Sequence, residues 1–302
     1  MKILVSTSSF GKADPTPLEE LRKKCEVVLN PYGRKLTTDE FVDLTEGMDG
    51  VIAGVEPITR EALEKRGNIK VISRCGVGLD SVDIEACKDL GIAIFNTPQA
   101  PVGSVAELTV TLMLDLIKNV SNMNAAVKAG SWNKMTGLML EGKKVGIIGF
   151  GRIGQRVAGI LQSFGVEIAY TDIEKKENAY RFMEKDELIK WADIITIHSS
   201  FCEEGKYIIG SKELADMKGC YLVNTSRGRF VEEDALFDSL TNGGLAGAAL
   251  DVFGTEPYKG KLSTLDNVIL TPHVASSAKE GRAVMEMEAV QNLFTGLGIA
   301  ND

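Results

Sequence analysis

Short runs of apolar and β-branched residues alternate with longer stretches of helical spacing along the chain. In the first hundred residues these runs occupy positions 2–6, 25–29, 50–55, 70–75 and 91–96. A second set follows at 144–150, 166–170, 193–198, 220–224, 245–252 and 267–271. Strands that alternate with helices pair in parallel. The pattern therefore predicts an α/β protein with two doubly wound parallel sheets, of the Rossmann-like and flavodoxin-like kind.

Two helical stretches flank the second set of strands. Residues 104–130 form a long, mostly apolar pattern that is opened by Pro101 and by a capping box at Ser104 and Glu107. Apolar side chains on more than one face make this stretch a candidate domain boundary and a candidate oligomer contact. Residues 278–294 repeat apolar side chains at helical spacing, so we expect a closing helix there.

Length and composition limit the classes of function. The 302 residues exceed what one hydrophobic core usually organises, which predicts two domains. A net charge of -8 without a long basic block argues against nucleic acid or an anionic membrane as a partner. The five cysteines form no Cys-x-x-Cys pair, and no apolar run reaches the roughly 18 residues of a membrane span. We therefore expect free thiols and a cytoplasmic protein.

The first chemical motif is a glycine pattern. Gly149, Gly151 and Gly154 form G-x-G-x-x-G directly after an apolar run and at the start of a helical one. Glycines there let a pyrophosphate approach the N–H groups of the helix N-terminus. Asp172 ends the next apolar run, about 20 residues further on, where an acid binds the adenosine ribose and repels a 2′-phosphate. No arginine follows Asp172 directly, so the motif favours NAD over NADP.

Three further side chains suit proton and hydride chemistry. His273 stands in "ILTPHVAS", Glu256 in "VFGTEP" and Arg227 in "VNTSRGRF", each just after a predicted strand. An imidazole can exchange the hydroxyl proton, an adjacent carboxylate can orient the ring, and a guanidinium can hold a substrate carboxylate. Each also has a plain alternative: a structural ring, a loop acid before proline, or a surface arginine.

The chain resembles the D-isomer-specific 2-hydroxyacid dehydrogenases, and among them most closely the D-3-phosphoglycerate dehydrogenases. The resemblance runs from about residue 69 to residue 294. It rests on the segments "SRCGVGLDSVD", "GIAIFNTP", "SVAEL", "GSWNK", "GKKVGIIGFGRIG", "LVNTSRG", "AALDVFGTEP" and "NVILTPHVAS".

The resemblance implies a role for each matching residue. His273 would be the general acid/base, Glu256 its partner and Arg227 the group that binds the substrate carboxylate and carbonyl oxygen. The cofactor residues would be Gly149, Gly151, Arg152, Ile153 and Gly154 at the pyrophosphate, Asp172 at the ribose, and Thr225 and Asp251 at the nicotinamide. The substrate residues would be Gly76, Val77 and Gly78, with Arg74 at a phosphate. No metal ion is implied, and His198 is expected to be structural or to lie near the cofactor.

The resemblance also implies an architecture and a reaction. Residues 1–98 with 278–302 would bind substrate and residues 99–277 would bind NAD, with a cleft between them and a homodimer formed through the long helix. We expect NAD-dependent oxidation of a small D-2-hydroxy acid, with 3-phosphoglycerate as the predicted substrate. Two alternatives stay open. One is a hydroxypyruvate or glyoxylate reductase or a pathway-specific 2-hydroxyacid dehydrogenase, and the other is an NADH-sensing corepressor. At 302 residues, no C-terminal regulatory domain and no feedback by serine are expected.

Overall fold

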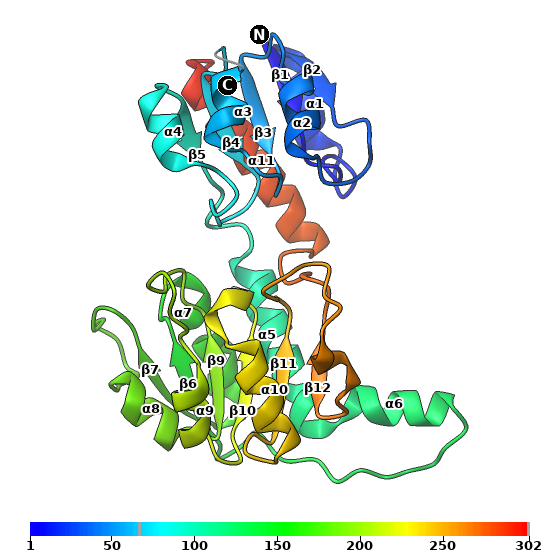
Figure 1. Ribbon diagram of the computed structural model, residues 1–302, viewed down its shortest axis with the longest axis vertical. Coiled ribbons are helices and arrows are strands. Elements are labelled where there is room, and N and C mark those ends of the chain that lie inside the picture. Colours follow the sequence, from blue (N-terminus) through cyan, green and yellow to red (C-terminus); the bar gives the residue numbers. More distant parts are fainter. Residues whose placement is uncertain (66–67, 301–302) are drawn as a thin grey trace. The chain divides into compact units, whose positions relative to one another are not determined.

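The computed structural model describes residues 1–65 and 68–300, and these fold into two compact units. Unit 1 comprises the chain up to residue 101 together with the segment from residue 277, and unit 2 comprises residues 102–276 (Figure 1). The division predicted at residues 98 and 278 thus falls at 101 and 277. Residues 301–302 of the predicted first domain lie outside the described residues.

Unit 1 is built on a five-stranded parallel sheet in the order β2-β1-β3-β4-β5. Its elements are β1 (Lys2–Val5), α1 (Thr16–Lys24), β2 (Glu26–Leu29), α2 (Thr38–Leu44), β3 (Gly50–Ala53), α3 (Arg60–Lys65), β4 (Val71–Arg74), α4 (Ile84–Asp89), β5 (Ala93–Phe95) and α11 (Lys279–Leu297).

Alternate residues of each central strand of unit 1 enter different cores. Leu4 and Ile72 pack with side chains of α2, α3 and α4 on one face, whereas Ile3 and Val71 pack with α1 and α11 on the other. Both faces of these strands are therefore buried, which explains why the sequence reads as continuous apolar runs. The predicted helix at 278–294 is present as α11, and it covers β3, β4 and β5.

Unit 2 contains a seven-stranded parallel sheet in the order β12-β11-β10-β9-β6-β7-β8. Its strands are β6 (Lys144–Ile148), β7 (Glu167–Thr171), β8 (Arg181–Phe182), β9 (Ile194–Ile197), β10 (Tyr221–Asn224), β11 (Gly247–Leu250) and β12 (Val268–Leu270). Its helices are α5 (Val102–Lys118), α6 (Val120–Lys128), α7 (Arg152–Leu161), α8 (Lys185–Trp191), α9 (Ser211–Asp216), α10 (Glu233–Thr241) and the 3-10 turns η1 (Gln162–Phe164), η2 (Gly228–Phe230) and η3 (Lys261–Thr264). The predicted α/β class with two parallel sheets is confirmed. Six strands were expected here, and the two-residue β8 is too short to leave an apolar run.

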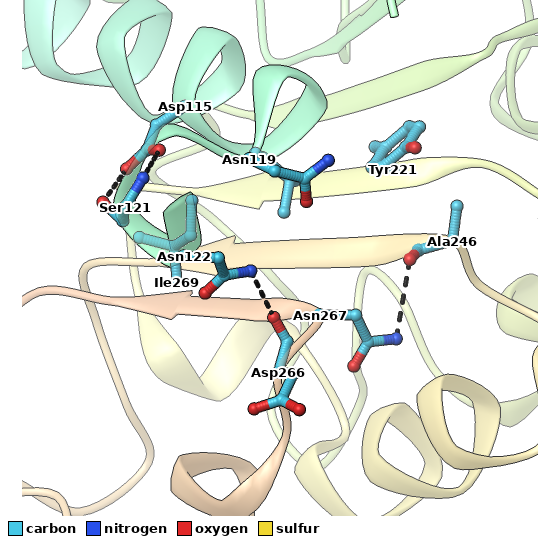
Figure 2. Close-up of a pocket in the computed structure, with 10 residues that line it drawn as sticks. Asp115, Asn119, Ser121, Asn122, Tyr221, Ala246, Asp266, Asn267 and Ile269 are labelled. Atoms are coloured by element: carbon cyan, nitrogen blue, oxygen red, sulfur yellow. Dashed lines mark hydrogen bonds between the residues drawn. The ribbon is translucent and has the colours of Figure 1, made fainter. Parts of the chain in front are cut away.

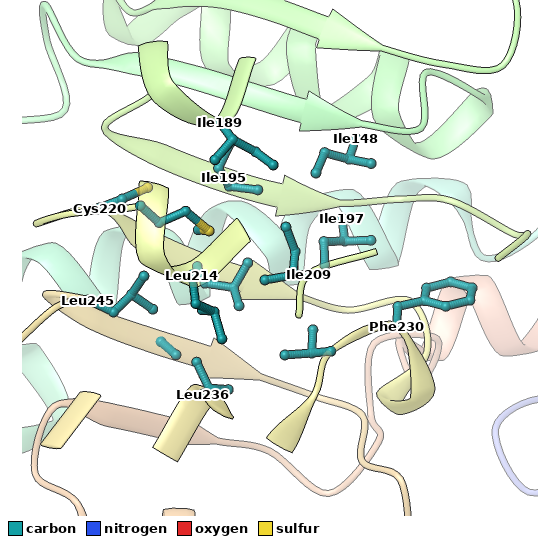
Figure 3. Packing of buried hydrophobic residues seen from close by; sticks show 14 of the residues in the cluster. Ile148, Ile189, Ile195, Ile197, Ile209, Leu214, Cys220, Phe230, Leu236 and Leu245 are labelled. Atoms are coloured by element: carbon teal, nitrogen blue, oxygen red, sulfur yellow. The ribbon is translucent and has the colours of Figure 1, made fainter. Parts of the chain in front are cut away.

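Two hydrophobic cores sandwich the sheet of unit 2. Ile195 and Ile197 point into a core with α8, α9 and α10, as Figure 3 shows for part of that cluster. Val145, Ile147 and Ile194 point into the opposite core, with α5 and α7. This arrangement leaves the carboxyl ends of the strands as the edge where loops can carry chemistry.

The single long helix expected over residues 104–130 is instead two helices. Asn119 adopts φ 56°, in the left-handed region, and separates α5 from α6. The Asp115 carboxylate then accepts hydrogen bonds from the backbone N–H of Ser121, at 2.7 Å, and from its hydroxyl (Figure 2). Asn122 donates to the carbonyl of Asp266 at 2.9 Å, so α6 starts in a new direction against the β11–β12 connection.

Candidate active site

The strand order of unit 2 reverses between β6 and β9, and the glycine motif lies at this switch point. Gly149 follows β6 with φ +89°, and a Cβ on it would lie 2.5 Å from the Ser199 nitrogen after β9. A Cβ on Gly154 would lie 2.3 Å from the Gly149 carbonyl oxygen. Gly151, by contrast, faces open space at the start of α7. Two glycines thus allow close packing, and the third leaves the helix N-terminus open to an anion.

Asp172 stands directly after β7 and faces the same turn. Its carboxylate accepts hydrogen bonds from the N–H groups of Phe150, at 2.9 Å, and Ile173, at 2.7 Å, and pairs with the Lys176 ammonium at 3.0 Å. Partial burial alone would raise the pKa of the Asp172 carboxyl, but the Lys176 ammonium and the two N–H groups outweigh it and lower this pKa. The acid is therefore fixed in orientation and charged at neutral pH.

A cavity of about 390 Å³ opens at this switch point. Ile173 and Phe201 present apolar side chains there that are 82% and 58% exposed. A planar base can cover such side chains, and Asp172 on the wall can accept the ribose hydroxyls. The cavity lining is Ile148, Gly149, Thr171, Asp172, Ile173, Lys185, Ser199, Phe201, Cys202, Glu203, Lys206, Tyr207 and Ile208. These residues suit the adenosine half of NAD.

Most of the residues that line this cavity were not predicted from the sequence. Only Gly149 and Asp172 of the set were predicted, because the segment after β9 has no fixed motif. The available signal was weak: Ile173 and Phe201 are large apolar residues in otherwise polar loops that directly follow strand ends. The predicted Arg152 is exposed and Ile153 half-buried in the first turn of α7, next to the open Gly151.

The structure brings His273 and Glu256 together at the ends of neighbouring strands. The ring Nδ1 of His273 lies 2.8 Å from a carboxylate oxygen of Glu256. The other oxygen of Glu256 accepts from the N–H of Phe253 at 3.1 Å, which holds the carboxylate in place. Because a carboxylate only accepts, Nδ1 carries the proton and Nε2 of the neutral ring keeps a lone pair. Nε2 is thus the atom that can take a proton from a substrate.

Asp251 fixes the loop that carries His273. It is fully buried at the end of β11, and one carboxylate oxygen accepts from the Thr271 hydroxyl at 2.5 Å and the Val274 N–H at 2.9 Å. The other oxygen accepts from the Ala275 N–H at 2.9 Å. His273 itself has φ 53°, a conformation that non-glycine residues seldom adopt without support. Asp251 supplies that support, while its predicted contact with nicotinamide stays a prediction.

Arg227 follows β10 in a turn that Asn224 organises. The Asn224 amide accepts from the Ser226 N–H at 3.0 Å and donates to the Arg227 carbonyl at 2.9 Å. A Cβ on Gly228 would lie 1.9 Å from the Phe253 carbonyl carbon, so this turn packs tightly on the segment that leads to Glu256. The guanidinium of Arg227 donates to the Ser226 carbonyl at 2.7 Å.

Thr225 is buried in the same turn. Its hydroxyl lies 2.8 Å from the hydroxyl of Thr109, which in turn donates to the Val105 carbonyl within α5. A hydroxyl that donates to Thr109 keeps lone pairs as an acceptor. The turn after β10 is therefore anchored to α5 as well as to β11.

The remaining predicted residues lie in unit 1, at the end of β4 and in the loop that follows it. The Gly76 N–H donates to the Thr97 hydroxyl at 2.7 Å, and the Val77 carbonyl accepts from Asn96 at 2.7 Å. Arg74 turns back onto the Cys75 carbonyl and covers Gly76, whose φ is +146°. The Gly76 N–H is thus already hydrogen-bonded within the protein. Val77, which is 37% exposed, and the half-buried Gly78 form the outer part of this loop.

His198 ends its strand as a buried ring next to the glycine turn. Its Nε2 lies 2.9 Å from the Thr196 hydroxyl, and its Nδ1 has no partner among the described residues. Burial lowers the pKa of the His198 ring to about 3 from the usual 6.5. Below pH 6.5 the unfolded chain therefore binds a proton that the folded chain does not, and stability falls by up to about 1.4 kcal/mol per pH unit.

Replacing His198 with asparagine should reduce the sensitivity of the fold to acid. The stability advantage of the original protein over H198N is expected to shrink by about 2 kcal/mol between pH 7 and pH 5, because only the histidine gains a proton on unfolding. Urea unfolding of both proteins at the two pH values measures this difference. A constant gap between the two proteins would mean that the His198 ring gains its proton as readily in the folded protein as in the unfolded chain.

Together, a glycine turn with a cavity that suits an adenosine, an oriented histidine and a turn that carries an arginine, all along one sheet edge, define a nicotinamide-dependent dehydrogenase. The family model for the D-isomer specific 2-hydroxyacid dehydrogenase NAD binding domain matches residues 110–275. The chain belongs to this family and is an NAD-dependent oxidoreductase. The predicted family and cofactor are thereby confirmed.

Individual relatives support the same assignment. A hydroxypyruvate reductase of Thermotoga maritima is 37% identical over 274 residues, which cover 87% of this chain and 90% of that protein. A D-3-phosphoglycerate dehydrogenase of Methanocaldococcus jannaschii is 40% identical over 258 residues, 82% of this chain and 49% of that protein. This chain therefore spans about half the length of that relative. The structure of a D-lactate dehydrogenase from Aquifex aeolicus, complexed with NAD and lactic acid, is similar to this chain with a TM-score of 0.86 and 27% identity. The match covers 99% of this chain and 96% of that one.

Proposed function

We propose that Arg227, Glu256 and His273 catalyse the oxidation of a D-2-hydroxy acid or the reverse reduction of its 2-oxo acid. In the oxidative direction Nε2 of His273 takes the hydroxyl proton while the C2–H bond breaks. NAD, when held by the glycine turn of residues 149–154 and by Asp172, would supply the acceptor for the hydride released from C2. In the reductive direction the protonated ring returns the proton to the oxygen. The pairing of His273 Nδ1 with Glu256 at 2.8 Å is the observation that supports this proposal most strongly.

Each of the three residues has a distinct task. Glu256 keeps the His273 ring in one tautomer and stabilises the imidazolium that forms when Nε2 gains a proton. The guanidinium of Arg227 is a planar donor that suits a carboxylate and the adjacent C2 oxygen. We assign substrate binding to unit 1 as well, through the loop of residues 76–78, and cofactor binding to unit 2.

Two three-carbon acids are the candidate substrates. 3-Phosphoglycerate is favoured by Arg74, which directly precedes the loop, and by the relative named D-3-phosphoglycerate dehydrogenase. Its unphosphorylated analogue, glycerate, which is oxidised to hydroxypyruvate, is favoured by the relative named hydroxypyruvate reductase, whose length the chain nearly matches. The two acids differ only in the phosphate, so they are distinguished by whether the protein binds that phosphate.

Initial rates of NADH oxidation with 3-phosphohydroxypyruvate and with hydroxypyruvate separate the candidates. A preference of about a hundredfold for the phosphorylated acid, or roughly 2.7 kcal/mol of transition-state discrimination, would establish the phosphate as part of the substrate. Equal or reversed rates would establish a small-acid reductase. No turnover of either acid, with NADH binding retained, would contradict the proposed substrate class.

We also propose that the protein is a homodimer formed through α6 and the segment that follows it. No residue of α6 is buried, and this nine-residue helix is shorter than the roughly 12–15 residues at which isolated helices become stable. Large apolar side chains nevertheless stand exposed there: Val120, Val127, Trp132, Met135, Leu138 and Met139. A second copy of the chain would cover them and remove an apolar patch from water.

Replacing Val127 by glutamate should therefore convert the dimer into a monomer. Val127 is 49% exposed, and a carboxylate there would have to be desolvated in the interface. Light scattering of V127E should give half the mass of the original protein, whereas V55E, a matched change at a 53% exposed site in unit 1, should leave the mass unchanged. A monomeric original protein would refute the proposal.

A further inference from the structure

Lys176 places an ammonium group directly beside the carboxylate that reads the adenosine ribose. Its Nζ lies 3.0 Å from the Asp172 carboxylate and 2.9 Å from the Phe150 carbonyl oxygen. An ammonium has three N–H donors, and these two are its acceptors among the residues that the structure describes. The side chain is 36% exposed, so its third donor can reach solvent or a ligand at the cavity edge.

This arrangement changes what Asp172 can exclude. An unpaired acid at this position rejects a 2′-phosphate because like charges repel in a partly desolvated site. Here the ammonium of Lys176 offsets the charge of the carboxylate, and the N–H groups of Phe150 and Ile173 already occupy acceptor sites on it. The ribose hydroxyls that donate hydrogen bonds to Asp172 would lie within a few ångströms of Nζ. A phosphate on the 2′-oxygen would therefore lie equally close to Nζ.

The cavity lining as a whole carries no net negative charge. Its charged side chains are two acids, Asp172 and Glu203, and two lysines, Lys185 and Lys206. Lys206 pairs with Glu203, and Lys185 pairs with Glu213 at 2.8 Å. With Lys176 included, three lysines stand beside three acids among these side chains. The electrostatic barrier to a second phosphate is therefore small.

We propose that the adenosine site accepts a 2′-phosphate, so that the protein binds NADP(H) as well as NAD(H), and that Lys176 is the residue that decides this selectivity. The inference rests on the proposed function only in assigning the switch-point cavity to the adenosine half of the cofactor. It adds a second nucleotide to the NAD dependence of this protein. Lys176 would leave Asp172 partly and donate to the phosphate oxygens, while Asp172 would keep the 3′-hydroxyl.

Binding rather than turnover gives the direct test. Dissociation constants for NADH and NADPH can be measured from the fluorescence of the reduced nicotinamide on the intact protein. Displacement of NADH by adenosine 2′,5′-bisphosphate and by adenosine 5′-monophosphate isolates the 2′-phosphate. We expect NADPH to bind within about 30-fold of NADH, and the bisphosphate to displace NADH at least as well as the monophosphate.

Variants at neighbouring lysines identify the residue responsible. K176Q should weaken NADPH binding by about tenfold or more and leave NADH binding within about threefold, because only the 2′-phosphate loses its cation. K176R should keep most of the NADPH affinity. K175Q is the matched control, since Lys175 is exposed and adjacent and the net charge changes equally. It should alter neither nucleotide selectively.

The possible failures are distinct. NADPH binding weaker than NADH binding by more than about a hundredfold in the original protein would refute the inference and leave the dehydrogenase proposal intact. So would equal effects of K176Q and K175Q on the two nucleotides. Failure to bind either nucleotide would instead contradict the assignment of the cavity, and with it the proposed function.

Discussion

Replacing His273 by alanine is expected to lower kcat by about 10²–10⁴ while NADH still binds with its original affinity. Among the described residues, His273 supplies the only ring nitrogen beside Glu256 that has a free lone pair, so without it the hydroxyl proton would have to pass to water. Steady-state rates give kcat, and nucleotide fluorescence gives the dissociation constant. The side chain is 48% exposed, so its loss should change stability little.

Glu256→Gln provides the companion measurement. An amide can still contact Nδ1 but carries no charge to stabilise the imidazolium. We therefore expect a smaller loss of kcat than in H273A and an altered pH profile of kcat/KM. A kcat within about threefold of the original protein in H273A would remove the histidine from the mechanism.

Replacing Asp251 by alanine is expected to destabilise unit 2 by about 3 kcal/mol and to reduce kcat by about a hundredfold. The change removes the acceptor of the Thr271 hydroxyl and of the N–H groups of Val274 and Ala275, in a fully buried place. Each buried donor left without a partner costs about 1–3 kcal/mol, partly recovered if water enters. His273 would lose its left-handed conformation together with this support.

Two measurements separate positioning from cofactor binding at Asp251. Urea unfolding gives the stability loss, and kcat under conditions where the variant is folded gives the loss of geometry. D251N keeps one carbonyl oxygen and should lose less of both. If D251A instead weakens NADH binding alone, with kcat and stability unchanged, Asp251 is a nicotinamide ligand and the loop does not depend on it.

Some features were predictable because they depend on local spacing. The central strands of both sheets are buried on both faces, so each leaves a continuous apolar run in the sequence. The glycine motif with Asp172 behaves similarly, since a tight turn and a ribose acid have a fixed separation along one βαβ unit. Strand β8 was missed because two residues, Arg181 and Phe182, make no pattern.

Other features depend on contacts between distant segments. The break at Asn119 could not be read from the apolar spacing, which continues through it; it is stabilised by Asp115 and by the carbonyl of Asp266 from another part of the chain. The walls of the cavity at the switch point come from segments after β6, β7 and β9. The sequence offered only isolated apolar residues there.

The sequence by itself determined the fold class and the family and supplied the residues that we propose react, because each of these depends on residue type and short-range spacing. Only the tertiary structure decided how those residues act. It showed that His273 is oriented by Glu256 and supported by Asp251, and that Asp172 carries Lys176 as a partner. Hydrogen bonds and ion pairs require partners within about 3 Å, and that distance is set by how the strand ends come together rather than by their order along the chain.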